Sequence, residues 1–352
     1  MPRAAIAFSV TSLLPVPLIA AGALWGGLWI WVALACMTVF AFAMDEWIAR
    51  TAHLASRRGG FPAHDLLSAV LALAQFVLLG LAVFALSGGT GLGGAERLAL
   101  FLAAGLYLGQ VGNSNAHELI HRRVRGLNAL GRWVYISVLF GHHASAHPLV
   151  HHRFVGTDRD PNSARLGESY YRFFRRAWAG SFRQGYAAEC ERLARAGRNG
   201  AWDNPYSVYY AGAVLAVFAA AFIGGAAGVI AHLALSVFAQ SQLLVSDYVQ
   251  HYGLRRGRLP DGRTQPVSPR HSWNAPHWYT GHMMLNAPRH SDHHAHPDRP
   301  YPDLEMPTEA EAPTLPRSLP AMALLALWPG RWKKVMDPRV ESWNARTERA
   351  AA

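Results

Sequence analysis

Cysteine is nearly absent from this sequence, which has only Cys36 and Cys190 among its 352 residues. The two lie far apart and neither belongs to a C-x-x-C motif, so a disulfide is not expected. An iron–sulfur module needs about four clustered cysteines, and the sequence has no such cluster. Internal repeats of about 20–50 residues are also missing, which excludes the repeat architectures.

Charged residues are few, at 16%, whereas hydrophobic residues make up 51% of the chain. The mean hydropathy is nevertheless only +0.07, so apolar and polar residues must be segregated along the sequence. Six apolar runs are long enough to cross a hydrocarbon core of about 30 Å. We predict membrane spans at roughly 4–23, 26–44, 66–87, 96–114, 206–225 and 227–249. The first run is followed at once by the second, without a signal-peptide cleavage site, which favours a membrane helix there.

Basic residues are distributed very unevenly around these runs. Of the 33 Lys and Arg residues, 14 lie from Arg122 to Arg198 and 14 from Arg255 to Arg349, whereas only Arg97 lies at the opposite ends of the predicted spans. Since basic residues are retained in the cytoplasm, both termini and both long polar segments are predicted to be cytoplasmic. The net charge of +11 follows from this distribution, and no nucleic-acid-binding motif is present. We therefore expect contact with membrane lipid and an acidic partner, and no nucleic acid.

The expected fold is an all-α integral membrane protein with six transmembrane helices and a cytoplasmic, histidine-rich helical cap. Four segments make up one functional domain. They are transmembrane helices one to four (1–114), a cytoplasmic His-rich segment (115–205), transmembrane helices five and six (206–250) and a cytoplasmic His-rich C-terminal segment (251–352).

Histidines occur in four blocks near the predicted cytoplasmic ends of the spans. The first, HELIH (117–121), taken alone has the form of a zinc-protease motif, in which two histidines on one helix face bind zinc beside a glutamate base. The others are HPLVHH (147–152), the single histidine of SDYVQHYGL (246–254) and RHSDHHAHPDRPY (289–301). Their spacing suits metal ligation. The nine candidate ligands are His117, His121, His147, His151, His152, His251, His290, His293 and His294.

Nine imidazoles are too many for one tetrahedral zinc ion, which takes at most about four ligands. They match two ions with four or five imidazoles each, and a pair of redox metals can activate dioxygen where a lone zinc cannot. The fourth and sixth spans end where the first and third blocks lie, so all four blocks can converge at one depth. His232 lies 19 residues before His251 on the same predicted helix, about 28 Å away, and is excluded from the site.

The combination of HELIHRR, HPLVHHRFVGTDRDPNSARLGES, SDYVQHYGL and HSWN with RHSDHHAHPDRPY resembles the membrane alkane monooxygenases of the membrane fatty-acid desaturase and hydroxylase superfamily. Xylene monooxygenase is a near relative of that family. The resemblance extends with gaps from about 30 to 305. It implies six membrane helices, the inner membrane of a bacterium, and an alkane 1-monooxygenase-like activity on the terminal C–H bond of an alkane.

The resemblance also implies the cofactors and partners. The nine histidines would hold two non-haem iron ions, and dioxygen would be the cosubstrate. The substrate would be an apolar small molecule that arrives through membrane lipid. Electrons would come from a rubredoxin or ferredoxin with its NAD(P)H-dependent reductase, because the two cysteines of this sequence cannot form such a module.

The sequence departs from the family's pattern without losing a ligand. Ala146 and Val150 stand where the second block usually has glutamate and glycine, and Ala287 and its neighbour proline replace Leu-Gln. The third block usually reads Asn-Tyr-x-Glu-His-Tyr-Gly, and here Asp247 and Gln250 occupy the Asn and Glu positions. These changes alter the surroundings of the metals, so the substrate can differ from a medium-chain alkane.

Three carboxylates lie close enough in sequence to orient ligand imidazoles through the second ring nitrogen: Glu118, Asp160 and Asp292. Each has the alternative of being a simple surface carboxylate.

Several other side chains have two interpretations. Trp25, Trp29 and Trp31 are candidates for a substrate tunnel, with an interfacial aromatic belt as the alternative. His142 and His143 compete with the second block for ligand roles. Four further histidines are expected to be structural or to support the ligand histidines without binding metal themselves: His271, His277, His282 and His296.

Other functions would use some of the same residues. A desaturase or hydroxylase of fatty acids or other lipids, or a xylene-type monooxygenase of alkyl arenes, would need the same metals, and only the products distinguish them. An intramembrane zinc protease would leave seven of the nine histidines unexplained. A metal transporter would place its ligands near the midplane of the membrane, along a helix pathway.

Overall fold

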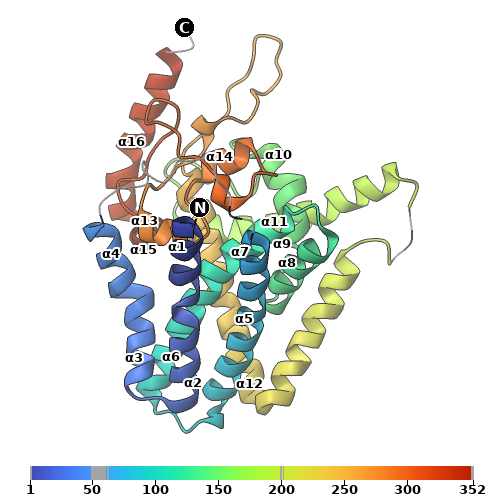
Figure 1. Ribbon diagram of the computed structural model, residues 1–352. Coiled ribbons are helices and arrows are strands. Elements are labelled where there is room, and N and C mark those ends of the chain that lie inside the picture. Colours follow the sequence, from blue (N-terminus) through green and yellow to red (C-terminus); the bar gives the residue numbers. More distant parts are fainter. Residues whose placement is uncertain (1, 49–60, 62, 199, 201, 350–352) are drawn as a thin grey trace.

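The computed structural model describes residues 2–48, 61, 63–198, 200 and 202–349 (Figure 1). Over this part of the chain the regular structure is helical, with two isolated bridges and no strand. The all-α class predicted from the sequence is therefore confirmed.

Three helical segments in the first ninety residues are long and apolar enough to cross a membrane: Arg3–Trp25, Leu28–Trp47 and His64–Gly89. Each agrees with a predicted span to within three residues at either end. Their elements are α1 (Pro2–Leu13) with α2 (Pro15–Trp25), α3 (Leu28–Ala35) with a π-helical turn (Cys36–Phe40) and α4 (Ala41–Trp47), and α5 (His64–Phe84) with a π-helical turn (Ala85–Gly89).

The fourth predicted span, 96–114, belongs to a helix that runs on without a break as α6 (Gly94–Tyr107), a π-helical turn (Leu108–Gly112) and α7 (Asn113–Ile120). It is not among the four long apolar helices of the described chain, and its second half carries the buried polar side chains of Gln110 and Asn115. This helix lies inside the bundle rather than on its surface.

Small residues allow the inner helix to pack closely against its neighbours. A methyl group added to Gly105 would collide with Phe238 of α12, and one added to Gly109 would collide with Gln242 of the same helix. Glycine at four-residue spacing is typical of helix pairs that approach closely within membranes.

The fifth and sixth predicted spans both lie in α12 (Tyr206–His251). The helical dihedral angles break at Gly224 and Gly225, and the two arms form a V in which the second arm returns beside the first (Figure 1). Gly225 has φ 60° and ψ −146°, a backbone region that is open almost only to glycine. The break coincides with the predicted boundary between the two spans.

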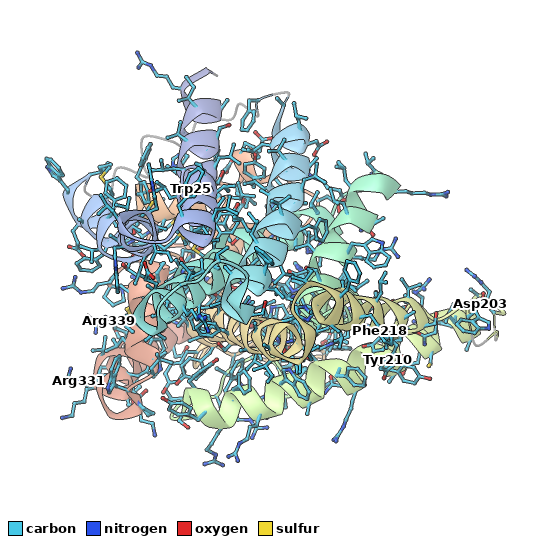
Figure 2. The ribbon with its side chains drawn as sticks, turned by 90° about the horizontal axis from the view of Figure 1, so that it is seen from below. Trp25, Asp203, Tyr210, Phe218, Arg331 and Arg339 are labelled. Carbon is cyan, nitrogen blue, oxygen red and sulfur yellow. The ribbon has the colours of Figure 1, made fainter. Side chains whose placement is uncertain are left out.

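Large apolar side chains cover the outside of these helices. Only 11% of the apolar window of α12 is buried, and Phe218 and Phe222 of its first arm are 68% and 93% exposed. Figure 2 shows Phe218 on the outer side of this arm. A surface of this kind is unfavourable in water and favourable in lipid, so the chain is an integral membrane protein.

The remaining helices gather around the end of the bundle where α7 and α12 finish (Figure 1). Here α8 packs against α7, α5 and α12, and α15 packs against α12 and α16. They are α8 (Arg125–Ser137), α9 (His143–Ala146), a π-helical turn (His147–His151), α10 (His152–Phe154), α11 (Tyr170–Arg195), α13 (Trp278–Met283), α14 (His290–Ala295), α15 (Leu319–Ala326) and α16 (Pro329–Arg349), with 3-10 turns at Pro269–His271 and Tyr301–Asp303.

The turn in α12 predicts a difference between two glycine-to-alanine variants. Gly225→Ala should lower the free energy of unfolding by about 1–3 kcal/mol, because alanine is strained at this φ and ψ. Gly80→Ala, inside α5, should be neutral or slightly stabilising, since an added methyl meets no atom within 4 Å and alanine favours the helix. Thermal unfolding of both variants in one detergent measures the difference. Equal midpoints would contradict the strained turn.

Candidate metal centre

The first histidine block ends the inner helix. His117 lies on the last turn of α7, His121 follows directly after it, and their ring centroids are 5.3 Å apart. The π-helical turn Leu108–Gly112 precedes α7. Such turns are rare and are common at functional sites, because they shift the direction of the side chains that follow.

The second block forms a π-helical turn, His147–His151, which leads into α10. The N–H of His152 donates to the carbonyl of His147, five residues earlier. The Nε2 atoms of these two histidines lie 2.8 Å apart, whereas His151 joins a different set of rings. The three rings of this block lie close together, but they divide between two groups of histidines, because the wider turn pairs positions i and i+5.

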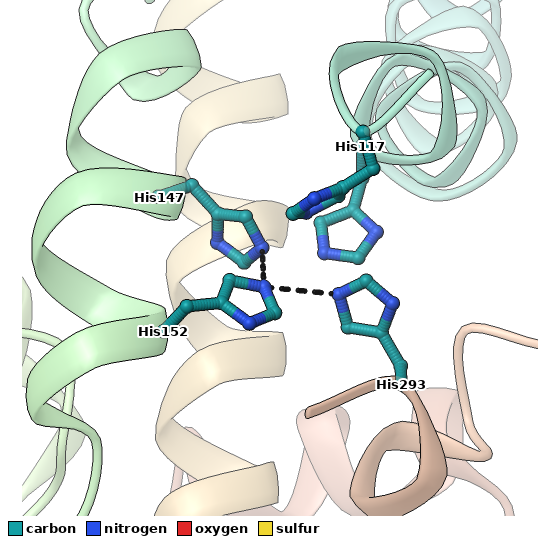
Figure 3. A group of neighbouring side chains, drawn as sticks. His117, His147, His152 and His293 are labelled. Atoms are coloured by element: carbon teal, nitrogen blue, oxygen red, sulfur yellow. Dashed lines mark hydrogen bonds between the residues drawn. The ribbon is translucent and has the colours of Figure 1, made fainter. Parts of the chain in front are cut away.

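The structure brings all nine candidate histidines together in two groups. Within each group, one nitrogen of every ring lies within 4.8 Å of those of the other rings. The first group, part of which is drawn in Figure 3, is His117, His121, His147, His152 and His293, and the second group is His151, His251, His290 and His294. The second and fourth blocks contribute to both groups, so the groups adjoin, with the rings of His152 and His294 4.5 Å apart.

The nitrogens of the first group fit a cation better than a set of hydrogen bonds. Nε2 of His152 lies 2.8 Å from Nε2 of His147 and 3.1 Å from Nε2 of His293 (Figure 3). One such nitrogen carries either one proton or one lone pair, so it cannot satisfy both neighbours well. The Nε2 atoms of His117 and His121 are buried and have no hydrogen-bond partner. Buried, unsatisfied nitrogens are costly, and a bound cation removes that cost.

The second group has the same chemistry. Nε2 of His290 lies 2.9 Å from Nε2 of His251 and 3.1 Å from Nε2 of His294. Nε2 of His151 is buried and has no hydrogen-bond partner. Five imidazoles in one group and four in the other are donor sets suited to two transition-metal ions.

Asp160 orients one of these rings. Its Oδ2 accepts a hydrogen bond of 2.9 Å from Nδ1 of His151, which leaves Nε2 to face the second group. Ser163 and the backbone N–H of Asn162 also donate to this carboxylate. Burial raises the pKa of Asp160, but the charge of His151 and these hydrogen bonds outweigh burial and hold the pKa below its usual value. Asp160 is therefore an ionised carboxylate behind a ligand position.

The hydrogen bonds and the ion pair of Glu118 do not involve any of the nine candidate rings. Its Oε1 lies 2.8 Å from the guanidinium of Arg122 and accepts a hydrogen bond of 3.1 Å from the N–H of Tyr301. The glutamate of HELIH thus ties α7 to the C-terminal segment and is not placed as the base of a metal-bound water.

Asp292 likewise forms its hydrogen bonds with the chain segment that follows α14 and not with a candidate ligand. It accepts hydrogen bonds of 2.7 and 2.8 Å from Arg299, one of 3.0 Å from Nδ1 of His296 and one of 2.8 Å from the N–H of Glu305. These bonds fix α14 to the segment that follows it, and so position the fourth block indirectly.

The three tryptophans lie away from the histidines. Trp25, Trp29 and Trp31 surround the turn between α2 and α3, at the opposite end of the bundle (Figures 1 and 2). They are 71%, 48% and 48% exposed. Side chains this exposed do not form the wall of an enclosed tunnel, and their position fits the alternative of an interfacial aromatic belt.

The other histidines of the described residues lie outside the two groups. The ring of His143 is 5.0 Å from that of His147, and Nε2 of His142 lies 3.3 Å from the hydroxyl of Ser181. His232 is buried on the second arm of α12, and its Nε2 donates to the carbonyl of Ser137 at 2.7 Å. Also outside the groups are His271, His277, His282 and His296.

A small cavity touches both groups. It has a volume of about 30 Å³, which is room for one or two water-sized molecules, and His117 and His290 both line it. Its other lining residues include the apolar Leu243, Met284 and Leu319 and the polar Asn113, Tyr135, Asp247 and Gln250. A further cavity of about 10 Å³ shares Asn113, Tyr135 and Leu243 with it and reaches Leu108 inside the bundle. The two cavities therefore adjoin each other between the bundle interior and the histidines.

Most of this lining was missed from the sequence, because it depends on how α7, α8 and α12 pack. The exceptions are the histidines already named, His117, His143 and His290, and the departures noted at Asp247, Gln250 and Ala287. The structure places Asp247 and Gln250 at the cavity, where Asp247 accepts a hydrogen bond of 2.6 Å from Asn162.

Comparison with known proteins identifies the family. The sequence model of the fatty acid desaturase family matches residues 95–325, which include all four histidine blocks. Alkane 1-monooxygenase 2 of Pseudomonas aeruginosa is 35% identical over 253 residues, which cover 72% of this chain and 67% of that protein. The chain belongs to the alkane monooxygenase family, within the fatty acid desaturase family.

Two further similar proteins show how far the similarity extends. Alkane 1-monooxygenase 1 of Alcanivorax borkumensis is 36% identical over 250 residues, 70% of this chain and 61% of that protein. The xylene/toluene monooxygenase hydroxylase component XylM of Pseudomonas putida is 28% identical over 236 residues, 66% of this chain and 61% of that protein. The match to this chain thus spans about 61% of the length of these two relatives.

The role of Asp160 predicts selective loss of metal. Asp160→Asn should weaken metal binding by the second group by about 10–100-fold, because the amide cannot supply the carboxylate's charge to His151. Metal content after dialysis against graded chelator, measured by elemental analysis, tests this. Asp158→Asn is the matched control, since Asp158 lies in the same loop but is exposed and paired with Arg255. Equal retention of both ions in the two variants would remove Asp160 from this role.

Proposed function

We propose that the chain is a membrane non-haem diiron monooxygenase that hydroxylates the terminal C–H bond of an alkane or a similar apolar chain. The observation that carries the proposal is the convergence of nine imidazoles in two groups beside one cavity. Membership of a family whose curated relatives are alkane 1-monooxygenases supports the same activity. The proposed ligands are His117, His121, His147, His152 and His293 for one ion and His151, His251, His290 and His294 for the other.

Iron fits the donor set, because imidazole suits iron and neither group contains a thiolate. When bound, the iron pair would supply the redox chemistry of the overall reaction RH + O₂ + 2 e⁻ + 2 H⁺ → ROH + H₂O. The protein would hold the ions through the nine imidazole rings, whose places are set by the backbone that carries them. The ring of His151 is also oriented by its hydrogen bond to Asp160.

The cavity of about 30 Å³ is too small for a whole alkane, so we propose that only the terminal methyl group of the substrate reaches it, beside His117 and His290. An alkane has no polar handle, so the apolar walls near Leu243, Met284 and Leu319 would select it by shape. One methylene group is worth only about 1–3 kcal/mol in such a pocket, so we expect a range of chain lengths to react. The polar side chains of Asn113, Tyr135, Asp247 and Gln250 lie on the same cavity, where hydrogen-bonding groups are needed because the reaction consumes protons.

The membrane arrangement we propose has six spans, with both termini and the histidine-rich cap on the cytoplasmic side of a bacterial inner membrane. The continuous inner helix 94–120 and the V of α12 support six crossings, since α12 passes along the bundle twice. The positions of the basic residues support the orientation. The histidines would then lie at the cytoplasmic ends of α7 and α12, reached by an apolar substrate from the bilayer.

The electron donor we propose is an acidic rubredoxin or ferredoxin that is reduced by an NAD(P)H-dependent reductase. The chain has two cysteines, which are too few for an iron–sulfur module of its own. From 114 to 204 there are 14 basic and 7 acidic residues, and from 251 onward there are 14 and 10, an excess of 11 positive charges. Such an excess steers an acidic protein toward this face.

The second candidate is an alkyl-arene monooxygenase of the xylene type, with a lipid desaturase or hydroxylase as a further alternative. The similarity to XylM favours the first of these, and the altered third block at Asp247 and Gln250 lies on the cavity that would receive the substrate. Conversion of a panel of alkanes, fatty acids and alkylbenzenes by whole cells tests all three. Terminal alcohols from alkanes, identified by mass spectrometry, are the expected products, and desaturated lipids or benzylic alcohols alone would contradict the proposal.

Iron content gives an independent test of the diiron site. We expect about two iron atoms per purified chain, because the nine imidazoles form two donor sets. His121→Ala and His294→Ala should each lower the iron content and abolish turnover. His232→Ala should keep both iron atoms and lose about 1 kcal/mol of stability, since it removes one buried hydrogen bond. Activity with one zinc and no iron would overturn the diiron assignment.

A further inference from the structure

The helix α11 lies across the two arms of α12 instead of along them (Figure 1). On the second arm, the side chain of Gln240 accepts a hydrogen bond of 2.8 Å from the indole N–H of Trp178. On the first arm, the hydroxyl of Tyr206 donates a hydrogen bond of 2.9 Å to the carbonyl of Phe182. The opposite side of α11 packs against α9 and the π-helical turn His147–His151.

These contacts place α11 at one end of the membrane-spanning length. Gln240 lies 15 residues after Gly225, and Tyr206 lies 18 residues before Gly224. At 1.5 Å per residue, the two contacts are about 22 and 27 Å from the turn of α12, measured along its arms. This turn lies at the same end of the bundle as the turn between α2 and α3 (Figure 1). Since the hydrocarbon core is about 30 Å thick, α11 lies where hydrocarbon gives way to headgroups on the other side.

Aromatic side chains of α11 face outward at this level. Tyr171, Trp178 and Tyr186 are each half-exposed. The ring of Phe182 lies 6.1 Å from that of Tyr210, an exposed residue of the first arm of α12. Tyrosine and tryptophan are favoured at the membrane–water interface, because one end of each side chain is apolar and the other is polar. The aromatic side of α11 therefore adjoins the surface that contacts lipid.

Three arginines on the same helix have no partner within the protein. The guanidinium groups of Arg172, Arg175 and Arg183 are exposed and form no hydrogen bond or ion pair with any residue that the structure describes. They lie within about 80° of one another around the helix. Arg176, by contrast, lies 2.7 Å from Glu168. The three free guanidinium groups can bind anions outside the chain, and their planar donors suit phosphate.

The exposed surface continues onto the junction of α15 and α16. The hydroxyl of Tyr171 donates a hydrogen bond of 2.9 Å to the carbonyl of Leu327, so the two stretches touch. Leu324, Leu327 and Trp328 are exposed, and basic residues follow them at the start of α16, where Arg331 projects outward (Figure 2). Neither 170–188 nor 319–336 contains an Asp or Glu residue. The basic interfacial surface is defined here by Arg172, Arg175, Arg183, Arg331, Lys333 and Lys334.

We propose that the basic interfacial surface binds the phosphate groups of anionic phospholipids in the leaflet nearest the histidine groups. Four to eight basic residues on an amphipathic segment at a bilayer surface attract anionic lipid, and this surface has six. Exposed tryptophan and leucine beside the charges are unfavourable in water and favourable between headgroups, which fits lipid better than a soluble protein. The inference goes beyond the proposed reaction and does not depend on it.

Lipid binding here would also support the metal site. The helix α11 packs against the π-helical turn His147–His151, which carries two of the candidate ligands. A lipid that binds the folded protein and not the unfolded chain stabilises the folded state. We therefore expect anionic lipid to raise the thermal stability of the protein.

The test compares two double variants that each remove two exposed positive charges. Arg175→Gln with Arg183→Gln alters the basic interfacial surface, and glutamine retains a good helix propensity. Arg258→Gln with Arg263→Gln is the matched control, in the loop after α12 that projects at the top of Figure 1. In phosphatidylcholine bilayers, spin-labelled phosphatidylglycerol or phosphatidylcholine reports the fraction of lipid held at the protein surface. Unfolding midpoints are measured with phosphatidylglycerol, with phosphatidylcholine and with inorganic phosphate.

We expect the unaltered protein to prefer phosphatidylglycerol to phosphatidylcholine by about two- to fourfold, because each basic residue near the surface attracts anionic lipid. The Arg175/Arg183 variant should lose at least half of this excess, and the control should keep it. Phosphatidylglycerol should raise the unfolding midpoint of the unaltered protein and the control more than that of the Arg175/Arg183 variant.

Equal lipid preference in the two double variants, or no preference in the unaltered protein, would overturn the proposed lipid site. A rise in the unfolding midpoint that inorganic phosphate reproduces would assign the arginines to free anions and would also overturn it. Each of these results leaves the proposed reaction untouched, since the products of whole-cell conversion test that reaction separately.

Discussion

The burial of nine imidazoles at one place is the constraint on which the rest of the structure depends. Neutral rings whose Nε2 atoms face one another at 2.8–3.1 Å are poorly satisfied by hydrogen bonds alone. Two cations satisfy them, and the four blocks must then meet although they are separated by up to about 170 residues. The ends of α7 and α12, the π-helical turn at His147–His151 and α14 are all placed so that this meeting occurs.

Close helix packing makes the convergence possible. Gly105 and Gly109 let the inner helix lie against α12, so that both helices deliver their final histidines to the same level. The turn at Gly225 returns α12 along the bundle toward His251. Rigid elements hold a metal site more accurately than loops do, and here helix ends or turns carry the ligand positions.

The two ends of the molecule have opposite physical character, and the histidines lie between them. Apolar side chains cover the membrane-length helices, and two small adjoining cavities with mixed apolar and polar linings lie between the bundle interior and His117 and His290. On the other side, Arg255, Arg256 and Arg270 line a hollow that also includes His271, whose carbonyl accepts a hydrogen bond from His251. The apolar substrate and the soluble electron carrier proposed above would therefore approach the histidines from different sides.

The sequence alone determined the helical class, most span boundaries and all nine ring positions that converge, because apolar length and clustered histidines are local signals. Only the tertiary structure decided how the nine divide, since the π-helical turn pairs His147 with His152 and leaves His151 to the other group. It also decided that Asp160 contacts a ring while Glu118 and Asp292 bind the backbone and arginines, and that Trp25 faces outward. Side-chain direction and contacts between distant segments depend on packing, which no local spacing specifies.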